Sequence, residues 1–367
     1  MAKDLRGRKL PKGIRQRGKT FEGRVTINGK THSVRGKTVT ETEQKLTELR
    51  YKLSRGIFAE NSRATFDEWF HIWLDEYRKL RIKIGTYETY RQFYKSLIFQ
   101  NLGSIPLCSI RNTDIQILIN HLAEKGYAYS TIKIVFSLIN SSLRQAMYNG
   151  MLERNPAASV QLPRRKLPEQ RRALTKEQQK IFSEFSKESK LYEFFAVLLR
   201  TGLRNGELRG LKFSDIDLDK NVLHVRRTIK YLDGRGYFED TPKTNSSLRD
   251  IPLTPDIIRL LYSKKDISSP ADYILKGKNS SPLGRDLVQT ELNNIIKNIN
   301  SHGYEFEHIT PHVFRHTFAT RAIEAGMSPQ VLKTILGHSS LTMTMDLYSH
   351  VMPETRASEM EKISGAF

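Results

Sequence analysis

The chain begins with a pattern typical of a small β-sheet followed by a helix. Two strand-like runs, residues 21–27 and 30–35, flank Asn28-Gly29, a dipeptide that favours a two-residue hairpin turn. A helix is expected to start at Thr40, where Glu43 completes a capping box, and to stop at Gly56. Residues 1–62 are therefore predicted to form a two- or three-stranded basic sheet packed on one helix.

Residues 63–163 have the periodicity of an all-helical bundle. Thr65 and Glu68 form a second capping box, and aromatic residues then recur at helical spacing, which indicates a buried face. These aromatic residues are Phe66, Trp69, Phe70, Trp73 and Tyr77. Further helices are expected at about 86–98, 113–125 and 129–149.

The third unit, residues 173–367, combines helices with a few strands. A helical segment ends near residue 199, strand-like pieces follow at 221–227 and 247–253, and helices then return. Pro311 and Pro329 are expected in the first turns of two helices that Gly326 and Gly337 close. The predicted fold class is α+β multidomain: the basic sheet with its helix, the helical bundle, and a mainly helical unit with a small antiparallel sheet.

Residues 164–172 are predicted to link the second and third units. Two prolines in and beside this segment prevent a continuous helix, and its basic residues suit a strap laid against a phosphate backbone. A solvated hinge between domains is a compatible alternative.

The charge of the chain favours a polyanionic partner. Its 367 residues include 60 Lys and Arg against 39 Asp and Glu, a formal net charge of +21. The first 40 residues hold 12 basic and two acidic side chains, a charge of +10. This clustering favours nucleic acid over a membrane surface, although a structural domain with a solvated basic face remains an alternative. The candidate DNA contacts are Arg15, Arg17, Arg24, Lys30, Arg35, Arg164, Arg165 and Lys166.

Two compartments are disfavoured by the sequence. No apolar run reaches the ~18–20 residues of a membrane span, and the first residues lack the apolar core of a secretory signal. With Cys108 as its single cysteine, the chain cannot form an internal disulfide, which fits a reducing cytoplasm.

A late tyrosine carries the candidate chemistry. Tyr348 follows two arginine-bearing segments, residues 201–207 and 310–316, and a Leu336-Gly-His338 step. Only about one tyrosine hydroxyl in a thousand is ionised at neutral pH, so a tyrosine nucleophile needs a base or cations nearby. Two guanidiniums can clamp the non-bridging oxygens of a phosphodiester, and a lysine or histidine can protonate the leaving alkoxide.

Arg204 and Arg315 are the candidates for this clamp. Arg204 opens a predicted helix whose apolar face includes Leu208 and Leu211, and Arg315 lies three residues after His312 on one helical face. For either arginine alone, a structural salt bridge is an equal alternative. Two such arginines with Tyr348 in the same unit favour catalysis.

His312 and His316 have the spacing of a metal-binding pair on a helix. No glutamate follows His312 as a metalloprotease helix requires, and Arg315 adds a cation between them. No metal and no cofactor are therefore expected.

The third unit resembles the catalytic domain of tyrosine recombinases, and the whole chain resembles the three-part integrases of temperate phages and conjugative transposons. The resemblance is carried by residues 201–208 and 312–316, by Leu336-Gly-His338 and by Tyr348. It implies that Tyr348 is the nucleophile and that Glu207 orients the first arginine. The implied catalytic residues are Arg204, Lys243, His312, Arg315, His338 and Tyr348.

The lysine that protonates the leaving 5′ oxygen is less closely specified. Lys230 and Lys264 also lie between the two arginine motifs. The Pro-Lys-Thr step at Lys243, followed by Arg249 and residues 251–253, makes Lys243 the best fit to the family pattern.

The resemblance also implies a function. Residues 1–62 would bind arm sites on double-stranded DNA and residues 63–163 core sites. Four copies would exchange strands through a 3′-phosphotyrosyl intermediate and a Holliday junction in a bacterial cytoplasm, at the nucleoid. A DNA-bending accessory or an excision factor would assist integration and excision of a mobile element.

Two other functions remain open from the sequence. A type IB topoisomerase would use the same residues and rejoin the same strand, but two DNA-binding units before the catalytic one argue against it. A silent DNA-architectural protein is disfavoured by the complete catalytic set.

Overall fold

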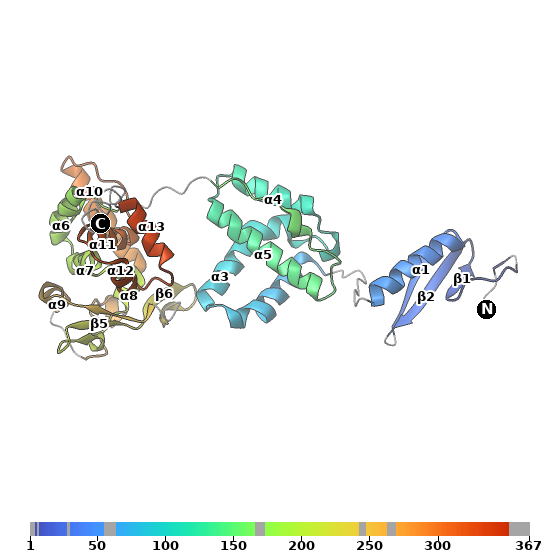
Figure 1. The fold of residues 1–367 in the computed structure, drawn as a ribbon, viewed down its shortest axis with the longest axis horizontal. Coiled ribbons are helices and arrows are strands. Elements are labelled where there is room, and N and C mark those ends of the chain that lie inside the picture. The colour runs from blue at the N-terminus through green and yellow to red at the C-terminus, as the bar shows by residue number, and fades with distance from the viewer. Residues whose placement is uncertain are drawn as a thin grey trace, which may run out of the picture. The chain divides into compact units, whose positions relative to one another are not determined.

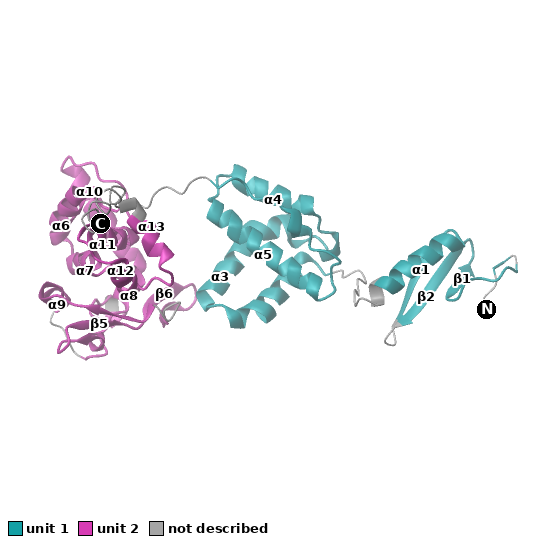
Figure 2. Ribbon diagram, in the orientation of Figure 1, with its two compact units in different colours: residues 1–168 teal, residues 169–367 magenta. Residues whose placement is uncertain are grey.

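The computed structural model describes residues 4–5, 7–27, 30–54, 64–165, 173–241, 247–262 and 269–351. The chain divides into two compact units, residues 1–168 and 169–367 (Figure 2). The boundary between them falls inside the segment 164–172 that the sequence indicates as a linker. The division of the first unit at residue 62 stays a prediction.

The N-terminal end of the first unit is a three-stranded antiparallel sheet with one helix (Figure 1). Its elements are β1 (Ile14–Arg17), β2 (Thr20–Ile27), β3 (Lys30–Gly36) and α1 (Val39–Ser54). Strand β2 lies in the middle, and Ile27 pairs with Lys30, which is the register of a two-residue hairpin. Asn28 and Gly29 themselves lie outside the described residues.

The start of helix α1 differs from the prediction. The hydroxyl of Thr38 accepts a hydrogen bond from the backbone N–H of Glu41 at 3.1 Å, and the Glu41 carboxylate accepts one from the N–H of Lys37 at 2.8 Å. The predicted box of Thr40 with Glu43 is wrong, because Thr38 already occupies the capping position. Gly56 lies outside the described residues.

The rest of the first unit is a helical bundle. Its helices are α2 (Phe66–Ile72), α3 (Ile84–Phe93), α4 (Asn112–Glu124) and α5 (Tyr129–Tyr148). Helix α2 continues into π-helical turns at Trp73–Arg78 and α3 into those at Tyr94–Gly103, so the helix expected at 86–98 extends further than predicted. Short 3₁₀ segments lie at Lys79–Arg81, Leu107–Ser109 and Pro156–Ser159.

The aromatic stripe of this bundle is its core, as predicted. The side chains of Phe66 and Phe70 are completely buried, and those of Trp69 and Trp73 are almost so. The rings of Phe70 and Tyr94 stack with centroids 4.0 Å apart. The capping box of Thr65 with Glu68 is present and fixes the start of α2.

The second unit is mainly helical, with two small sheets. Its helices are α6 (Lys176–Phe185), α7 (Tyr192–Thr201), α8 (Asn205–Arg209), α9 (Pro255–Leu261), α10 (Arg285–Ser301), α11 (His312–Glu324), α12 (Pro329–Leu336) and α13 (Thr342–Val351). The two predicted strands are β5 (Val222–Val225) and β8 (Arg249–Pro252), antiparallel neighbours in a sheet with β4 (Ile216–Asp217). The predicted fold class is therefore confirmed.

A hairpin of β6 (Thr228–Leu232) and β7 (Gly236–Asp240) was not predicted. Asp233-Gly234 between the strands is a turn signal that could have revealed it. Helix α11 begins at His312, so Pro311 precedes the helix instead of lying in its first turn, whereas Pro329 is the first residue of α12 as expected.

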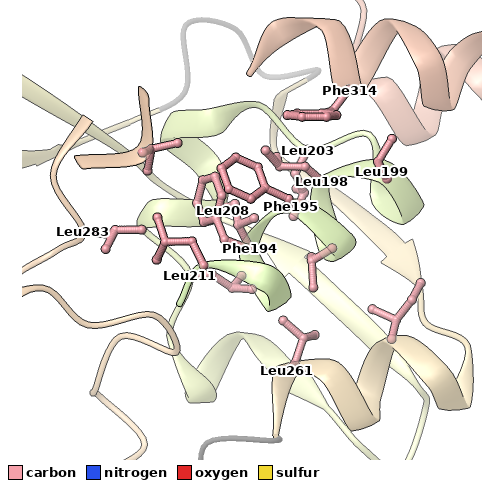
Figure 3. Close-up of a cluster of buried hydrophobic side chains, with 14 of the residues drawn as sticks. Phe194, Phe195, Leu198, Leu199, Leu203, Leu208, Leu211, Leu261, Leu283 and Phe314 are labelled. Atoms are coloured by element: carbon pink, nitrogen blue, oxygen red, sulfur yellow. The ribbon is translucent and has the colours of Figure 1, made fainter. Parts of the chain in front are cut away.

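The core of the second unit supports the segments that carry Arg204 and Arg315 (Figure 3). Leu203 and Leu208 are buried on either side of Arg204, and Phe314 is completely buried beside Arg315. Helix α8 is only five residues long, so Leu211 follows it in the chain, although both Leu208 and Leu211 are buried as expected. Among the described residues, no helix is long and apolar enough to cross a membrane.

Candidate active site

Arg204 and Arg315 are each held by the carbonyl of a helix-ending glycine. Gly202 ends α7 with a φ of 63°, and its carbonyl accepts a hydrogen bond from Nη1 of Arg315 at 2.9 Å. Gly337 ends α12 with a φ of 65°, and its carbonyl accepts from Nη2 of Arg204 at 3.2 Å. A Cβ on Gly202 would lie 2.4 Å from the ring of Phe318, so both the backbone conformation and the space require glycine.

Three guanidiniums meet at the C-terminal end of α12, on three successive carbonyls. The pairs are Arg249 with Ile335 at 2.6 Å, Arg315 with Leu336 at 2.6 Å, and Arg204 with Gly337 at 3.2 Å. The last carbonyls of a helix lack donors from the helix itself and carry the negative end of its dipole. They can therefore hold cations side by side that would otherwise repel one another.

Glu207 is the carboxylate of this cluster and is almost fully buried. It accepts hydrogen bonds from Nη1 of Arg204 at 2.7 Å and from Nη2 of Arg249 at 2.8 Å. Burial alone would raise the pKa of Glu207, but the hydrogen bond and charge of Arg249, with the charge of Arg204, hold it below its usual value. Glu207 is thus ionised and in contact with Arg204, the partner that the sequence predicts for it.

Arg315 has no carboxylate partner among the described residues. Its side chain is 5% exposed, and burial, followed by the charge of Arg204, lowers its pKa to about 9. The group is therefore still cationic at neutral pH. Glu207 attracts Arg315 without forming a direct ion pair with it. A buried charge that no carboxylate contacts is costly, so this position suits an anionic ligand.

His338 lies directly after α12, beside the arginines. Burial, followed by the charges of Arg315 and Arg204, lowers its pKa to about 4, so the imidazole is neutral at pH 7. Its Nδ1 lies 3.0 Å from the hydroxyl of Thr344, a buried residue of α13. If that hydroxyl donates to Nδ1, the other ring nitrogen carries a proton and can donate to a ligand.

His312 is exposed at the start of α11, and its ring meets that of His316 with centroids 5.0 Å apart. It also lines a groove with Asn205 and Arg285, so its imidazole is open to solvent next to the Arg204 segment. In the part of the chain that the structure describes, no group of three or more His, Cys, Asp or Glu side chains could hold a metal ion.

Tyr348 lies on α13, but its hydroxyl is turned away from the arginines. It donates a hydrogen bond to the carbonyl of Met327, just beyond the C-terminal end of α11, whereas Arg315 lies in the first turn of that helix. Burial raises the pKa of Tyr348. The structure thus brings together Arg204, Glu207, Arg315 and His338, and it places the Tyr348 hydroxyl elsewhere.

Of the three candidate lysines, Lys230 is the one that the structure describes. Lys243 and Lys264 lie outside the described residues. Lys230, in β6, forms an ion pair with Asp240 of β7 across the hairpin.

Two residues of the cluster escaped the sequence analysis as site residues. They are Arg249 and Thr344. Arg249 is buried in β8 on the same side of the strand as the apolar Ile251, and an arginine at such an inward-facing position was a readable signal. Thr344 gave none, because its contact with His338 depends on how α13 packs.

The N-terminal sheet carries a second candidate site on the face that points away from α1. Successive side chains of a strand point to opposite faces of the sheet, so this face is distinct from the one that packs on the helix. Glu22 in β2 is buried under arginines, with Arg15 at 2.8 Å, Arg17 at 3.3 Å and Arg24 at 3.4 Å from its carboxylate. Arg35 pairs with Glu22 across β2 and β3. One buried carboxylate thus organises the arginine face of this sheet, which consists of Arg15, Arg17, Arg24 and Arg35.

The remaining predicted DNA contacts are only partly described. Arg164 and Arg165 are exposed. The side chain of Lys30 and the whole of Lys166 lie outside the described residues.

Comparisons with known proteins place the chain in a family. Residues 168–355 match the sequence model of the Phage integrase family, and residues 65–123 match that of the Phage integrase N-terminal SAM-like domain. The tyrosine recombinase XerC-like protein of Caldanaerobacter subterraneus subsp. tengcongensis is 27% identical, covering 90% of this chain and 91% of that protein. The transposase from transposon Tn916 of Enterococcus faecalis is 26% identical, covering 88% and 82%.

Solved structures agree with this assignment. The Tn1549 transposon integrase in complex with transposon right end DNA is 27% identical with a TM-score of 0.72, covering 82% of this chain and 99% of that one. A lambda integrase tetramer bound to a Holliday junction shares the fold, with a TM-score of 0.58 at 20% identity over 91% of this chain and 98% of that one. Because the family model spans more than half of the residues, the chain belongs to the phage integrase family of tyrosine recombinases, which are site-specific recombinases.

Proposed function

We propose that the chain cuts and rejoins DNA at specific sites through a 3′-phosphotyrosyl bond to Tyr348, and so integrates and excises a mobile element. The observation that carries this proposal is the charge of the cluster at the end of α12. The cluster holds three guanidiniums but one carboxylate, Glu207, which pairs with Arg204 and Arg249, so two positive charges remain uncompensated among these four side chains. Such a site is complementary to a phosphodiester that gathers negative charge in its transition state.

In the cleavage step, each residue of the site has its own role. The Tyr348 oxygen attacks phosphorus, and the bond from phosphorus to the 5′ oxygen breaks. Arg204 and Arg315 bind the non-bridging oxygens, and neutral His338 donates a hydrogen bond to one of them. His312, exposed one turn before Arg315, accepts the phenolic proton.

The leaving 5′ oxygen takes a proton from Lys243. The charge of Lys230 is paired with Asp240, which makes that lysine the weaker candidate. Rejoining reverses these steps with a 5′ hydroxyl from a partner duplex. The energy of the cleaved bond is kept in the phosphotyrosine, so no nucleotide is consumed.

The Tyr348 hydroxyl leaves the Met327 carbonyl before it attacks. Thr344, one turn earlier on α13, already contacts His338. In this proposal, a movement of the last turns of α13 changes the direction of Tyr348 while the contact of Thr344 is retained.

The partner is double-stranded DNA. The arginine face of the N-terminal sheet binds arm sites, the helical bundle binds core sites, and Arg164 and Arg165 follow the backbone between units. Four copies act together on a Holliday junction in a bacterial cytoplasm, with an accessory bending or excision factor. The net charge of +21 and the DNA complexes of the related integrases support this assignment.

Incubation with two labelled duplexes that carry the core site tests the function. We expect a covalent protein–DNA product and new molecules that join one duplex to the other. Supercoil relaxation without joined molecules would indicate a topoisomerase, and binding without any covalent product would indicate an architectural protein.

A further inference from the structure

Arg249 is a buried arginine that contacts both Glu207 of α8 and the C-terminal end of α12. Its side chain is 2% exposed. It donates from Nη2 and Nη1 to the two carboxylate oxygens of Glu207, at 2.8 and 3.2 Å, and from Nε to the carbonyl of Ile335 at 2.6 Å. One planar guanidinium therefore joins α8 to the end of α12.

The carboxylate that Arg249 holds is the same one that holds Arg204. Glu207 accepts from Nη1 of Arg204 at 2.7 Å, on the oxygen that also accepts from Nη1 of Arg249. The two arginines differ in access, because the side chain of Arg204 is 36% exposed and that of Arg249 is 2% exposed. A bound phosphate can meet Arg204, whereas the contacts of Arg249 are directed into the protein.

This sharing determines how much of the charge of Arg204 is available to a ligand. With Arg249 present, the single negative charge of Glu207 is divided between two guanidiniums. Without it, Glu207 would be a buried carboxylate paired with Arg204 alone, and would hold that guanidinium in a tight one-to-one ion pair. The end of α12 would also lose the donor to Ile335, beside the carbonyls that hold Arg315 and Arg204.

We propose that Arg249 is a positioning residue for strand cleavage: it neutralises Glu207 and fixes the end of α12, so that Arg204 presents its charge to the scissile phosphate. This inference rests on the proposed function. It predicts an effect on the chemical step that depends on the charge of Glu207 and on the charge of the phosphate.

The first test compares Arg249→Met, Arg249→Lys and the double variant Arg249→Met with Glu207→Gln in the full chain. The rate of covalent complex formation is measured on a nicked duplex that carries the core site, with DNA affinity measured separately. Arg249→Met should slow the covalent step about 100-fold, the size of effect expected when one transition-state donor is lost, with affinity unchanged. The double variant should recover at least about tenfold of this loss, because the neutral amide that replaces the Glu207 carboxylate no longer captures Arg204.

The second test changes the substrate. A methylphosphonate at the scissile position lacks one anionic oxygen, so its transition state needs less positive charge. On this DNA, Arg249→Met should react within about tenfold of the wild-type rate. Arg249→Lys keeps a charge but cannot span Glu207 and Ile335, and it should fall between wild type and Arg249→Met on the diester.

The outcomes separate this inference from the proposed function. If the wild-type chain forms no covalent product, both are wrong. If the wild type is active and Arg249→Met loses the same factor on both substrates, with no recovery in the double variant, Arg249 only stabilises the fold and the positioning role is wrong. If thermal unfolding shows that Arg249→Met is unfolded at the assay temperature, the comparison of the two substrates with Arg249→Lys decides in the same way.

Discussion

The hydroxyl of Tyr348 donates a hydrogen bond to the backbone carbonyl of Met327, at the opposite end of α11 from Arg315. One turn before Tyr348 on α13, Thr344 contacts His338 beside the arginine cluster. Helix α13 is thus connected to the candidate site through Thr344 while its tyrosine is directed elsewhere. Under the proposed function, the contact of Thr344 orients His338, whereas the contact with Met327 must break before Tyr348 can act as the nucleophile.

Thr344→Val tests the contact between Thr344 and His338. Valine has nearly the shape of threonine but cannot hydrogen bond to Nδ1 of His338, so the ring loses the partner that selects its tautomer. We expect covalent complex formation to slow by about tenfold and the free energy of unfolding to fall by about 1 kcal/mol. Thr342→Val, at an exposed position on the same helix, is the matched control. Equal cleavage rates in both variants would show that Thr344 does not act through His338.

His338 should also make the stability of the protein depend on pH. Its pKa is about 4 in the folded chain against an ordinary value of 6.5, so the unfolded chain binds a proton that the folded chain does not. Its contribution to stability is therefore complete above pH 6.5 and is lost as the pH falls towards 4. His338→Gln should lose less stability than the wild type between pH 7 and pH 5, measured by thermal unfolding.

The control for this measurement is His302→Gln, at an exposed histidine that follows α10. It should reproduce the pH dependence of the wild type. A His338→Gln variant with the same pH dependence as the wild type would show that this imidazole is not held neutral by burial and the arginines.

The sequence predicted the parts of this site that local patterns encode. The glycine that ends α12, Gly337, and the His-x-x-Arg spacing at Arg315 were readable because glycine caps and helical periodicity act over a few residues. The inward-facing position of Arg249 was readable, but its pairing with Glu207 was not, because Glu207 is 42 residues earlier in the chain and the pair forms only when β8 meets α8. The direction of the Tyr348 hydroxyl likewise depends on how α13 packs on α11.

The N-terminal sheet and α1 show the same contrast between local patterns, which were predicted, and contacts between strands, which were not. Alternation along the strands and the turn signal predicted the sheet, whereas the start of α1 was placed two residues too late because Thr38 and Thr40 are both plausible caps. That three arginines meet on Glu22 depends on strand register, which the sequence left open.

Glu22→Gln tests the arginine face of the N-terminal sheet. Removing the buried carboxylate frees the charges of Arg15, Arg17 and Arg24, so binding to random duplex DNA should tighten and its salt dependence should steepen. Binding to the arm site should improve less, because the arginines lose the group that fixes their arrangement. The ratio of specific to non-specific affinity should therefore fall.

Glu43→Gln is the matched control, because it removes one negative charge from an exposed position on α1 of the same domain. A fall in the specificity ratio of the same size in both variants would mean that only net charge matters on this face. Fluorescence anisotropy at two or more salt concentrations gives both affinities.

Under the proposed function, Tyr348 is the nucleophile. The most direct measurement is the covalent product formed on a nicked duplex that carries the core site, in excess EDTA, by the wild type, Tyr348→Phe and the control Tyr304→Phe, whose residue is exposed elsewhere in the second unit. We predict a 3′-linked covalent complex with the wild type and Tyr304→Phe, mapped to Tyr348 by peptide analysis, and none with Tyr348→Phe although it still binds the DNA. Covalent product from Tyr348→Phe at the wild-type level, or a wild-type linkage that maps to another residue, would contradict the assignment.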